Sequence, residues 1–394
     1  MSNLKIYCRN IEQTALEQIQ SLTEHPVYSD VSIRIMPDAH AGTGCTVGTT
    51  IALADKVTPN LVGVDIGCGM HVVELGKVDV NPAELDRIIN HQIPSGNNIR
   101  TEPVSECTMA EELIRQLKCF KSPSHWPLEY LKLSVGTLGG GNHFIELDKD
   151  DDGNVYLVIH SGSRKLGVRV CHYYQKMANT HMMELADNRR ELIARLKAEG
   201  RQHDIQLELA KQPRVQAVTT PLAYLEGDGF RDYLHDMDLC QRFAVLNRHT
   251  MARMIIEGLG VEAVSEWETI HNYIDVCNMI LRKGAISAQA GERVIIPMNM
   301  RDGSLVCIGK GNPDWNFSAP HGAGRLMSRS QALESIDMAV YRHDMEGIAS
   351  WSVCDSTRDE APGVYKPMES IIEQVEPTVR IERIIRPKYN YKAH

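Results

Sequence analysis

Histidines in loops are the chemically most informative residues of this chain, which has 394 residues and 16 His. Four of them lie beside Gly, Asn or Ser: His143, His160, His271 and His321. Loops that follow strands can hold side chains in fixed positions on a rigid scaffold. A single histidine of this kind is more often a hydrogen-bonded structural residue than a ligand or catalyst. The repeated pattern indicates metal binding or catalysis.

A carboxylate and a thiol lie three residues apart in Val64-Asp65-Ile66-Gly67-Cys68-Gly69. The glycine-rich turn lets both groups reach one ion. Cys68 alone would be a small buried hydrophobe. Together with the loop histidines, the pair favours a metal site with Asp, Cys and His ligands, and this ligand chemistry by itself indicates zinc.

A second motif, His321-Gly322-Ala323-Gly324-Arg325, is suited to phosphate chemistry. Small residues after His321 let a phosphate approach the imidazole, and the guanidinium of Arg325 can balance its charge. A neutral imidazole can attack phosphorus to form a phosphoramidate. Alternatively, the segment is only a turn that caps a helix starting near Ser328. Neither the P-loop nor the dinucleotide-binding fingerprint occurs.

The elements that must position these loops form an α+β pattern. The sequence predicts strands over 32–35, 70–75, 155–159, 293–296 and 305–308, the last two joined by a hairpin-like turn at 301–303. It predicts helices over 83–91, 109–118, most of 169–211, and 229–257. We expect one large mixed-sheet domain over residues 1–394, with a helical insertion over 176–230.

Composition is that of a globular protein, with 43% hydrophobic and 24% charged residues. Ten cysteines without a signal peptide or a long apolar stretch predict a cytoplasmic location and no membrane segment. The net charge of −9 argues mildly against nonspecific coating of nucleic acid. A local basic strip is possible in the tail, at Arg380, Arg383, Arg386, Lys388 and Lys392.

Five segments in order along the chain together resemble the RtcB family of GTP-dependent RNA ligases. They are Met36-Pro37-Asp38-Ala39-His40-Ala41-Gly42, Val64-Asp65-Ile66-Gly67-Cys68-Gly69, Gly141-Asn142-His143-Phe144-Ile145-Glu146, His160-Ser161-Gly162-Ser163-Arg164 and His321-Gly322-Ala323-Gly324-Arg325. Each would be weak evidence alone. The resemblance implies an enzyme of RNA repair or tRNA splicing. It would join an RNA 3′-phosphate or 2′,3′-cyclic phosphate to a 5′-hydroxyl, using GTP and two Mn²⁺ ions.

The resemblance also implies roles for individual residues. His321 would become guanylylated, with Arg164 and Arg325 contacting phosphate. Cys68 would bridge the two ions, and the implied metal ligands are Asp65, Cys68, His143, His160 and His271. The implied GTP contacts are Asn142, His143, Phe144, Glu146, Asn272, Pro297, Ser304, Gly322, Ala323, Gly324 and a C-terminal lysine, taken as Lys388.

One loop departs from the family, because Pro297-Met298-Asn299-Met300 stands where Pro-Gly-Ser-Met is common. This change resembles a bacterial side branch whose members often neighbour a release-factor homologue, which suggests RNA repair. Two alternatives remain. A metal-dependent phosphoesterase would open cyclic phosphates without joining ends, and a catalytically silent RNA-binding partner of the translation machinery would do neither.

Overall fold

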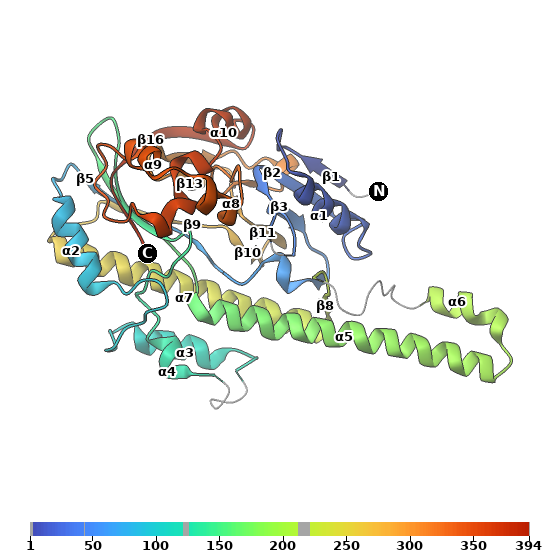
Figure 1. Cartoon of the computed structure of the whole chain (residues 1–394). Coiled ribbons are helices and arrows are strands. Elements are labelled where there is room, and N and C mark those ends of the chain that lie inside the picture. The colour runs from blue at the N-terminus through green and yellow to red at the C-terminus, as the bar shows by residue number, and fades with distance from the viewer. Residues whose placement is uncertain (1–2, 43, 121–125, 212–220, 394) are drawn as a thin grey trace.

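The computed structural model describes residues 3–42, 44–120, 126–211 and 221–393. It confirms a mixed α+β architecture built around two larger sheets (Figure 1). The seven-stranded sheet has the order β13-β14-β16-β6-β7-β5-β9 and is antiparallel throughout. Its strands are β5 (Gly69–Gly76), β6 (Phe144–Lys149), β7 (Val155–Ser161), β9 (Ser265–Ile270), β13 (Arg293–Asn299), β14 (Gly303–Gly309) and β16 (Val379–Lys392).

The five-stranded sheet has the order β1-β2-β3-β11-β10, and its β1–β2 pair is parallel. Its strands are β1 (Asn3–Ile6), β2 (Ser32–His40), β3 (Val47–Ala52), β10 (Asn272–Asp275) and β11 (Ile280–Lys283). Two short ribbons complete the strands: β4 (Lys56–Val57) with β8 (Leu225–Glu226), and β12 (Ala285–Ser287) with β15 (Ser318–Pro320).

Ten α-helices surround the sheets in the described part of the chain. They are α1 (Gln13–Glu24), α2 (Pro82–Gln92), α3 (Cys107–Gln116), α4 (Leu128–Lys132), α5 (Arg164–Ala198), α6 (Ile205–Ala210), α7 (Gly227–Leu259), α8 (Arg329–Ser335), α9 (Met338–Asp344) and α10 (Met368–Val375). Among the residues described, none of these helices has a stretch long and apolar enough to cross a membrane.

Local sequence signals set several helix ends. Asn81 accepts a hydrogen bond from the backbone nitrogen of Ala83 at the start of α2, and Pro82 fits the first turn. Gly260 ends α7 in the left-handed conformation, with φ of 64°. Ser328 and Gln331 form a capping box at the start of α8. The helix expected near Ser328 is therefore present.

Helices α5 and α7 run side by side, and α5 continues well beyond the body of the protein with α6 at its far end (Figure 1). In the second half of α5, Arg190 pairs with Asp187 and Arg195 with Glu199. The insertion expected over 176–230 thus begins inside a continuous helix. Residues 212–220 of that range lie outside the described residues.

The tail is a strand rather than a free basic strip. Strand β16 lies between β14 and β6 in the seven-stranded sheet. Arg383 pairs with Asp150 and Arg386 with Asp151, at 3.0 and 3.1 Å. Arg380 pairs with Glu382 at 3.2 Å. These three of the five basic residues of the suggested strip are therefore paired with carboxylates.

Candidate active site and metal centre

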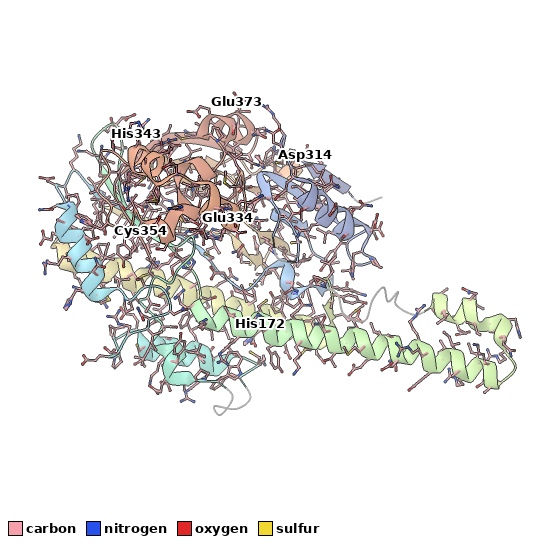
Figure 2. All side chains as sticks on the ribbon, in the orientation of Figure 1. His172, Asp314, Glu334, His343, Cys354 and Glu373 are labelled. Atoms are coloured by element: carbon pink, nitrogen blue, oxygen red, sulfur yellow. The ribbon has the colours of Figure 1, made fainter. Side chains whose placement is uncertain are left out.

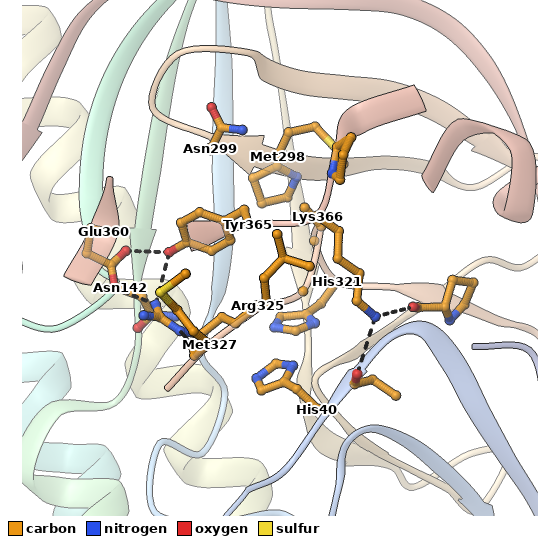
Figure 3. Close-up of a pocket in the computed structure, with 18 of the residues that line it drawn as sticks. His40, Asn142, Met298, Asn299, His321, Arg325, Met327, Glu360, Tyr365 and Lys366 are labelled. Atoms are coloured by element: carbon orange, nitrogen blue, oxygen red, sulfur yellow. Dashed lines mark hydrogen bonds and ion pairs between the residues drawn. The ribbon is translucent and has the colours of Figure 1, made fainter. Parts of the chain in front are cut away.

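A cavity of about 1210 Å³ lies between the His321 loop and the ends of several strands (Figure 3). Strand β2 contributes His40, the end of β13 contributes Met298 and Asn299, and the last residue of β16, Lys392, also lines it. Segments from both ends of the chain therefore meet around His321. The cavity is large enough for a nucleotide.

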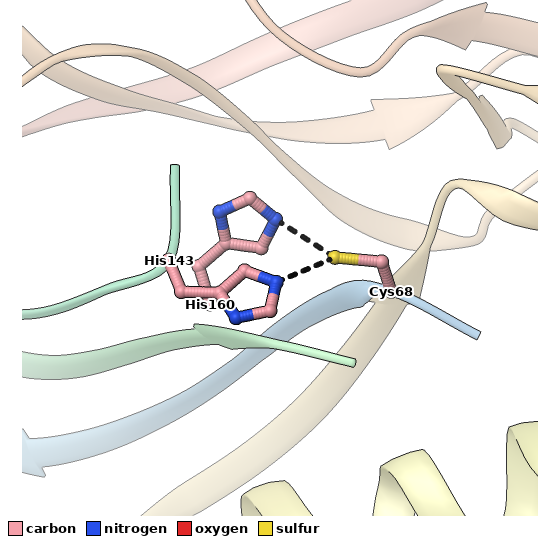
Figure 4. A group of neighbouring side chains, drawn as sticks. All are labelled: Cys68, His143 and His160. Carbon is pink, nitrogen blue, oxygen red and sulfur yellow. Dashed lines mark hydrogen bonds between the residues drawn. The ribbon is translucent and has the colours of Figure 1, made fainter. Parts of the chain in front are cut away.

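The predicted metal ligands converge beside this cavity. The Sγ atom of Cys68 lies 3.4 Å from Nε2 of His143 and 3.2 Å from Nε2 of His160 (Figure 4). Nε2 of His143 is 3.0 Å from Oδ2 of Asp65. Nε2 of His160 is 3.4 Å from Nε2 of His271. The structure thus brings all five residues together.

Backbone carbonyls fix the orientation of two of these imidazoles. Nδ1 of His143 donates to the carbonyl of Leu138 at 2.8 Å, and Nδ1 of His160 donates to the carbonyl of Asn142 at 3.1 Å. Because a carbonyl only accepts, each Nδ1 carries a proton. Both rings are therefore held with Nε2 toward Cys68, the orientation that a metal ligand in this cluster would need.

The electrostatics of the cluster also fit a cation. Burial and the neighbouring imidazoles lower the pKa values of His160 and His271 well below the ordinary range, so both rings are neutral. Although burial opposes it, His143 lowers the pKa of Asp65 to about 2. Burial and Asp65 raise the pKa of the Cys68 thiol. A bound cation would reverse that last effect and supply the thiolate.

Close packing around Asp65 depends on a glycine. A Cβ added to Gly162 would lie 2.1 Å from Oδ1 of Asp65, far inside van der Waals contact. The same loop continues into Arg164, which starts α5 with φ of 56°. Arg164 donates to Oγ1 of Thr137 and to the carbonyl of Gly96. Arg164 therefore follows the loop that packs on Asp65, and it does not line the cavity.

His321 is held by a carboxylate that the sequence interpretation did not assign. Oδ2 of Asp38 accepts from Nδ1 of His321 at 2.6 Å and from its backbone nitrogen at 3.1 Å. Nδ1 therefore carries a proton, which leaves Nε2 as the ring nitrogen that can act as a nucleophile. The His321 ring centroid lies 5.0 Å from that of His271. The only sequence signal for Asp38 was its place in the segment Met36–Gly42.

Seven of the eleven predicted nucleotide contacts line the cavity, and four do not: His143, Asn272, Ser304 and Lys388. Those in the cavity are Asn142, Phe144, Glu146, Pro297, Gly322, Ala323 and Gly324. His143 is a member of the donor cluster instead. Asn272 accepts from the backbone nitrogen of Gly284 at 2.9 Å. Ser304 is fully buried in β14, opposite Pro297.

Glu146 is a buried acid with an unusual pKa. Burial raises its pKa to about 7, against the opposing effects of Asn390 and Lys392. Nδ2 of Asn390 donates to Oε1 of Glu146 at 2.6 Å. The two residues face each other directly across β16 and β6. This carboxyl can therefore change its protonation when a ligand enters the cavity.

The lysine that lines the cavity is not the one predicted as the C-terminal nucleotide contact. Lys388 is exposed and does not line the cavity, whereas Lys392 is buried and does. Nζ of Lys392 lies 2.9 Å from Oε2 of Glu360 and 5.3 Å from the ring centre of Phe144. An irregularity in the register between Pro387 and Tyr389 precedes the buried end of β16, which pairs Lys392 with Phe144.

Arg325 lines the cavity but is bound to protein groups. Its guanidinium donates to the carbonyls of Met327 and Asp359 and lies 3.4 Å from Oε1 of Glu360. Its role near phosphate would require those contacts to rearrange. Arg329, which the sequence interpretation did not single out, also reaches Glu360, at 2.8 Å.

The loop at residues 297–300, whose sequence differs from the one common in the family, is anchored by two buried methionines. Met298 and Met300 are buried, and Sδ of Met300 accepts a hydrogen bond from the hydroxyl of Tyr341 at 3.1 Å. Asn299 donates to Asp302 at the turn before β14. Residues 297–300 nevertheless line the cavity.

Comparison with known proteins gives consistent matches over nearly the whole chain. The profile of the family described as "tRNA-splicing ligase RtcB" matches residues 18–129 and 124–393. The RNA-splicing ligase RtcB of Escherichia coli K12 is 30% identical over 406 residues, covering 92% of this chain and 90% of the relative. The tRNA-splicing ligases RtcB of Pyrobaculum aerophilum and Archaeoglobus fulgidus are 25% and 26% identical, covering 90% and 93% of this chain and 86% and 88% of the relatives.

Proposed function

The chain belongs to the RtcB family of RNA ligases, and we propose that it joins an RNA 3′-phosphate or 2′,3′-cyclic phosphate to a 5′-hydroxyl through a guanylylated His321. GTP is the nucleotide substrate in this proposal, and two Mn²⁺ ions are the metal cofactors. The relatives named as tRNA-splicing ligases make broken tRNA a candidate substrate.

The observation that carries the proposal is the place of His321. It lies in the cavity, with its Nδ1 bound to Asp38 and its ring next to that of His271. A nucleophile needs a free lone pair on a group of fixed orientation. A phosphoryl group in transfer also needs cations nearby. The contact with Asp38 fixes the orientation of His321, and cations held beside His271 would meet the second requirement.

The proposed reaction has three steps: guanylylation of His321, transfer of GMP to the RNA, and joining of the RNA ends. Nε2 of His321 forms a bond to the α-phosphorus of GTP, the bond to the β-phosphate oxygen breaks, and pyrophosphate leaves. An oxygen of the RNA 3′-phosphate attacks the phosphoramidate, so GMP moves to the RNA and His321 is restored. The 5′-hydroxyl attacks the activated phosphate and GMP departs. A cyclic phosphate must first be opened by water.

Divalent ions would be held by Asp65, Cys68, His143, His160 and His271, where they would neutralise phosphate charge. Three imidazoles, a thiol and a carboxylate suit a transition metal. Manganese accepts more oxygen ligands than zinc, which favours closed four-coordinate sites. We therefore assign manganese to the active enzyme and expect zinc to inhibit it.

Glu146 supports guanine over adenine. A carboxylate can accept hydrogen bonds from the N1 and N2 donors of guanine, which adenine does not have in that arrangement. Glu146 is buried against Asn390 at the cavity wall. The RNA 3′-phosphate is assigned to Arg164, whose guanidinium can form charge-assisted hydrogen bonds beside the metal loop.

The proposal is tested by mass spectrometry of the full chain after incubation with GTP and Mn²⁺. We expect one GMP adduct on His321 and sealing of a 3′-phosphate RNA to a 5′-hydroxyl RNA. His321→Ala should lose both and keep its metal content. The control is His343→Ala, because His343 is exposed and forms only a surface ion pair with Glu346 (Figure 2).

The same assay separates the alternatives. A phosphoesterase would open the cyclic phosphate without an adduct or a joined product. A catalytically silent RNA-binding protein would not open the cyclic phosphate, form the GMP adduct or join the RNA ends. Sealing by His321→Ala at the wild-type rate would contradict the assignment of the nucleophile.

A further inference from the structure

A second group of metal-ligating side chains lies on the other side of strand β5, away from the cavity. His71 of β5 and Glu268 of β9 face each other directly across the two strands. His249 comes from α7, which packs on β5. Ligand atoms of the three residues all lie within 4.8 Å of one another.

The spacing within this group matches that of ligands sharing one ion. Oε1 of Glu268 lies 3.2 Å from Nδ1 of His71 and 3.3 Å from Nε2 of His249. The two rings are 4.1 Å apart between centroids. Two ligands bound to one zinc at about 2.0–2.1 Å in tetrahedral geometry are roughly 3.4 Å apart.

The buried atoms of this group contact one another and Glu266, but these contacts are not well-formed hydrogen bonds. His71 is completely buried, and within the described residues neither of its ring nitrogens makes a well-formed hydrogen bond. Oε1 of Glu268 likewise forms no well-aligned hydrogen bond, and its contacts are the ion pairs with His71 and His249. Buried polar atoms are costly when their hydrogen bonds are poor, and a bound cation would satisfy Nδ1 of His71 and Oε1 of Glu268 together.

Two neighbouring residues, Glu266 and Arg248, contact His71 and Glu268 from outside the group, as residues that orient metal ligands do. Nε2 of His71 lies 3.4 Å from Oε2 of Glu266, which can orient the ring and increase its basicity. Arg248 binds Oε2 of Glu268 through Nε and Nη2, at 2.9 and 2.6 Å. The arginine therefore occupies one carboxylate oxygen and leaves the other for an ion.

We propose that His71, His249 and Glu268 bind a zinc ion, at a site separate from the metal centre of the cavity. Two imidazoles and one carboxylate are a known zinc donor set. His249 is 40% exposed, so the ion has access to solvent, and water can take the fourth position.

This zinc would support the cavity indirectly. Nη1 of Arg248 donates to the carbonyls of Gly67 and Ser161, at 2.9 and 2.7 Å. Those carbonyls belong to the residues next to Cys68 and His160. An ion on Glu268 would hold Arg248 in place and, through it, both loops of the metal centre. We therefore assign the zinc a structural role.

The first experiment measures zinc per chain. Metal-free full-length wild type, His249→Ala and the control His343→Ala are dialysed against Zn²⁺ and analysed by inductively coupled plasma mass spectrometry. We expect His249→Ala to bind one zinc fewer than the other two. The same single loss is expected when His249→Ala is added to Cys68→Ala. Equal zinc content in wild type and His249→Ala would overturn the proposal.

A second variant tests metal binding at position 249 by exchanging the imidazole for another metal ligand, a thiolate. His249→Cys in the Cys68→Ala background, loaded with Co²⁺, should show a new thiolate-to-cobalt absorption band in the near ultraviolet. The Cys68→Ala protein alone is the baseline, because nine other cysteines remain in it. Absence of the new band in a folded protein would overturn the proposal. Neither result depends on ligase activity, so the proposed function is tested separately.

Discussion

Asp38 and His321 are 283 residues apart in the chain, yet Oδ2 of Asp38 lies 2.6 Å from Nδ1 of His321. Asp38 comes from β2, in the five-stranded sheet, and His321 follows β15. The carboxylate is fully buried and the imidazole is 18% exposed. Asp38 therefore fixes the orientation of the ring from the protein interior, and the ring of His321 stays accessible from the cavity.

Asp38→Asn should slow guanylylation of His321 by roughly 10³–10⁴-fold, because an amide can donate to Nδ1 and favour the wrong tautomer. The rate of GMP adduct formation measures this. Circular dichroism and metal content should stay unchanged, since Asp38 is not in the donor cluster. A loss of less than tenfold would show that the carboxylate does not control the tautomer.

Cys68→Ala should lose Mn²⁺ binding and all guanylylation, because Cys68 is the donor that contacts both His143 and His160. Cys68→Ser should keep weak activity, since oxygen is also a manganese ligand. The measurement is adduct formation by metal-free protein reconstituted with each metal separately. Robust activity with zinc alone, or full activity of Cys68→Ala, would contradict the manganese assignment.

Lys392→Met should weaken GTP binding by about 10–100-fold, the usual effect of losing a hydrogen bond to a charged group. Lys388→Met is the matched control and should bind GTP normally, because Lys388 is exposed outside the cavity. Calorimetric titration with GTP compares the two. An equal effect of both substitutions would place the lysine contact elsewhere.

GTP affinity should rise with pH up to about 7 and then level off. Burial raises the pKa of Glu146 to about 7 in the free protein. Guanine requires the ionised form as an acceptor, so binding lowers this pKa and releases a proton. Below pH 7 the affinity should fall by up to about tenfold per pH unit.

Glu146→Gln provides the test of that pH dependence, because it cannot ionise. Its GTP affinity should be weaker than that of wild type at pH 8 and nearly constant between pH 6 and 8. Calorimetry in two buffers of different ionisation enthalpy should also detect the released proton in wild type only. An identical pH dependence in both proteins would assign the proton to another group.

Gly162→Ala should weaken Mn²⁺ binding by roughly 10–100-fold, as outer-shell changes at metal sites do. The new Cβ would meet Oδ1 of Asp65 at 2.1 Å and displace that ligand. Gly363→Ala is the control, because a Cβ there has no neighbour within 4 Å among the described residues. Equal Mn²⁺ affinity in the two variants would contradict the placement of Asp65.

Local sequence predicted those elements whose apolar pattern matches their burial. Strand β7 is buried along its full length and was predicted from the run at 155–159. Helix α7 was predicted within two residues at each end, because its pattern is helical and Gly260 stops it. Strand β16 was missed, because charged residues alternate with apolar ones in a tail that looked like a surface strip.

The sequence by itself determined the chemistry of the site, since ligand and nucleophile types are properties of single residues in short glycine-rich loops. Only the tertiary structure decided which distant groups meet them. The register of β16 on β6 places Asn390 opposite Glu146 and Lys392 opposite Phe144, and leaves Lys388 outside. The packing of β2 against the His321 loop brings in Asp38. Strand register and packing depend on contacts summed over whole elements, so no local motif encodes them.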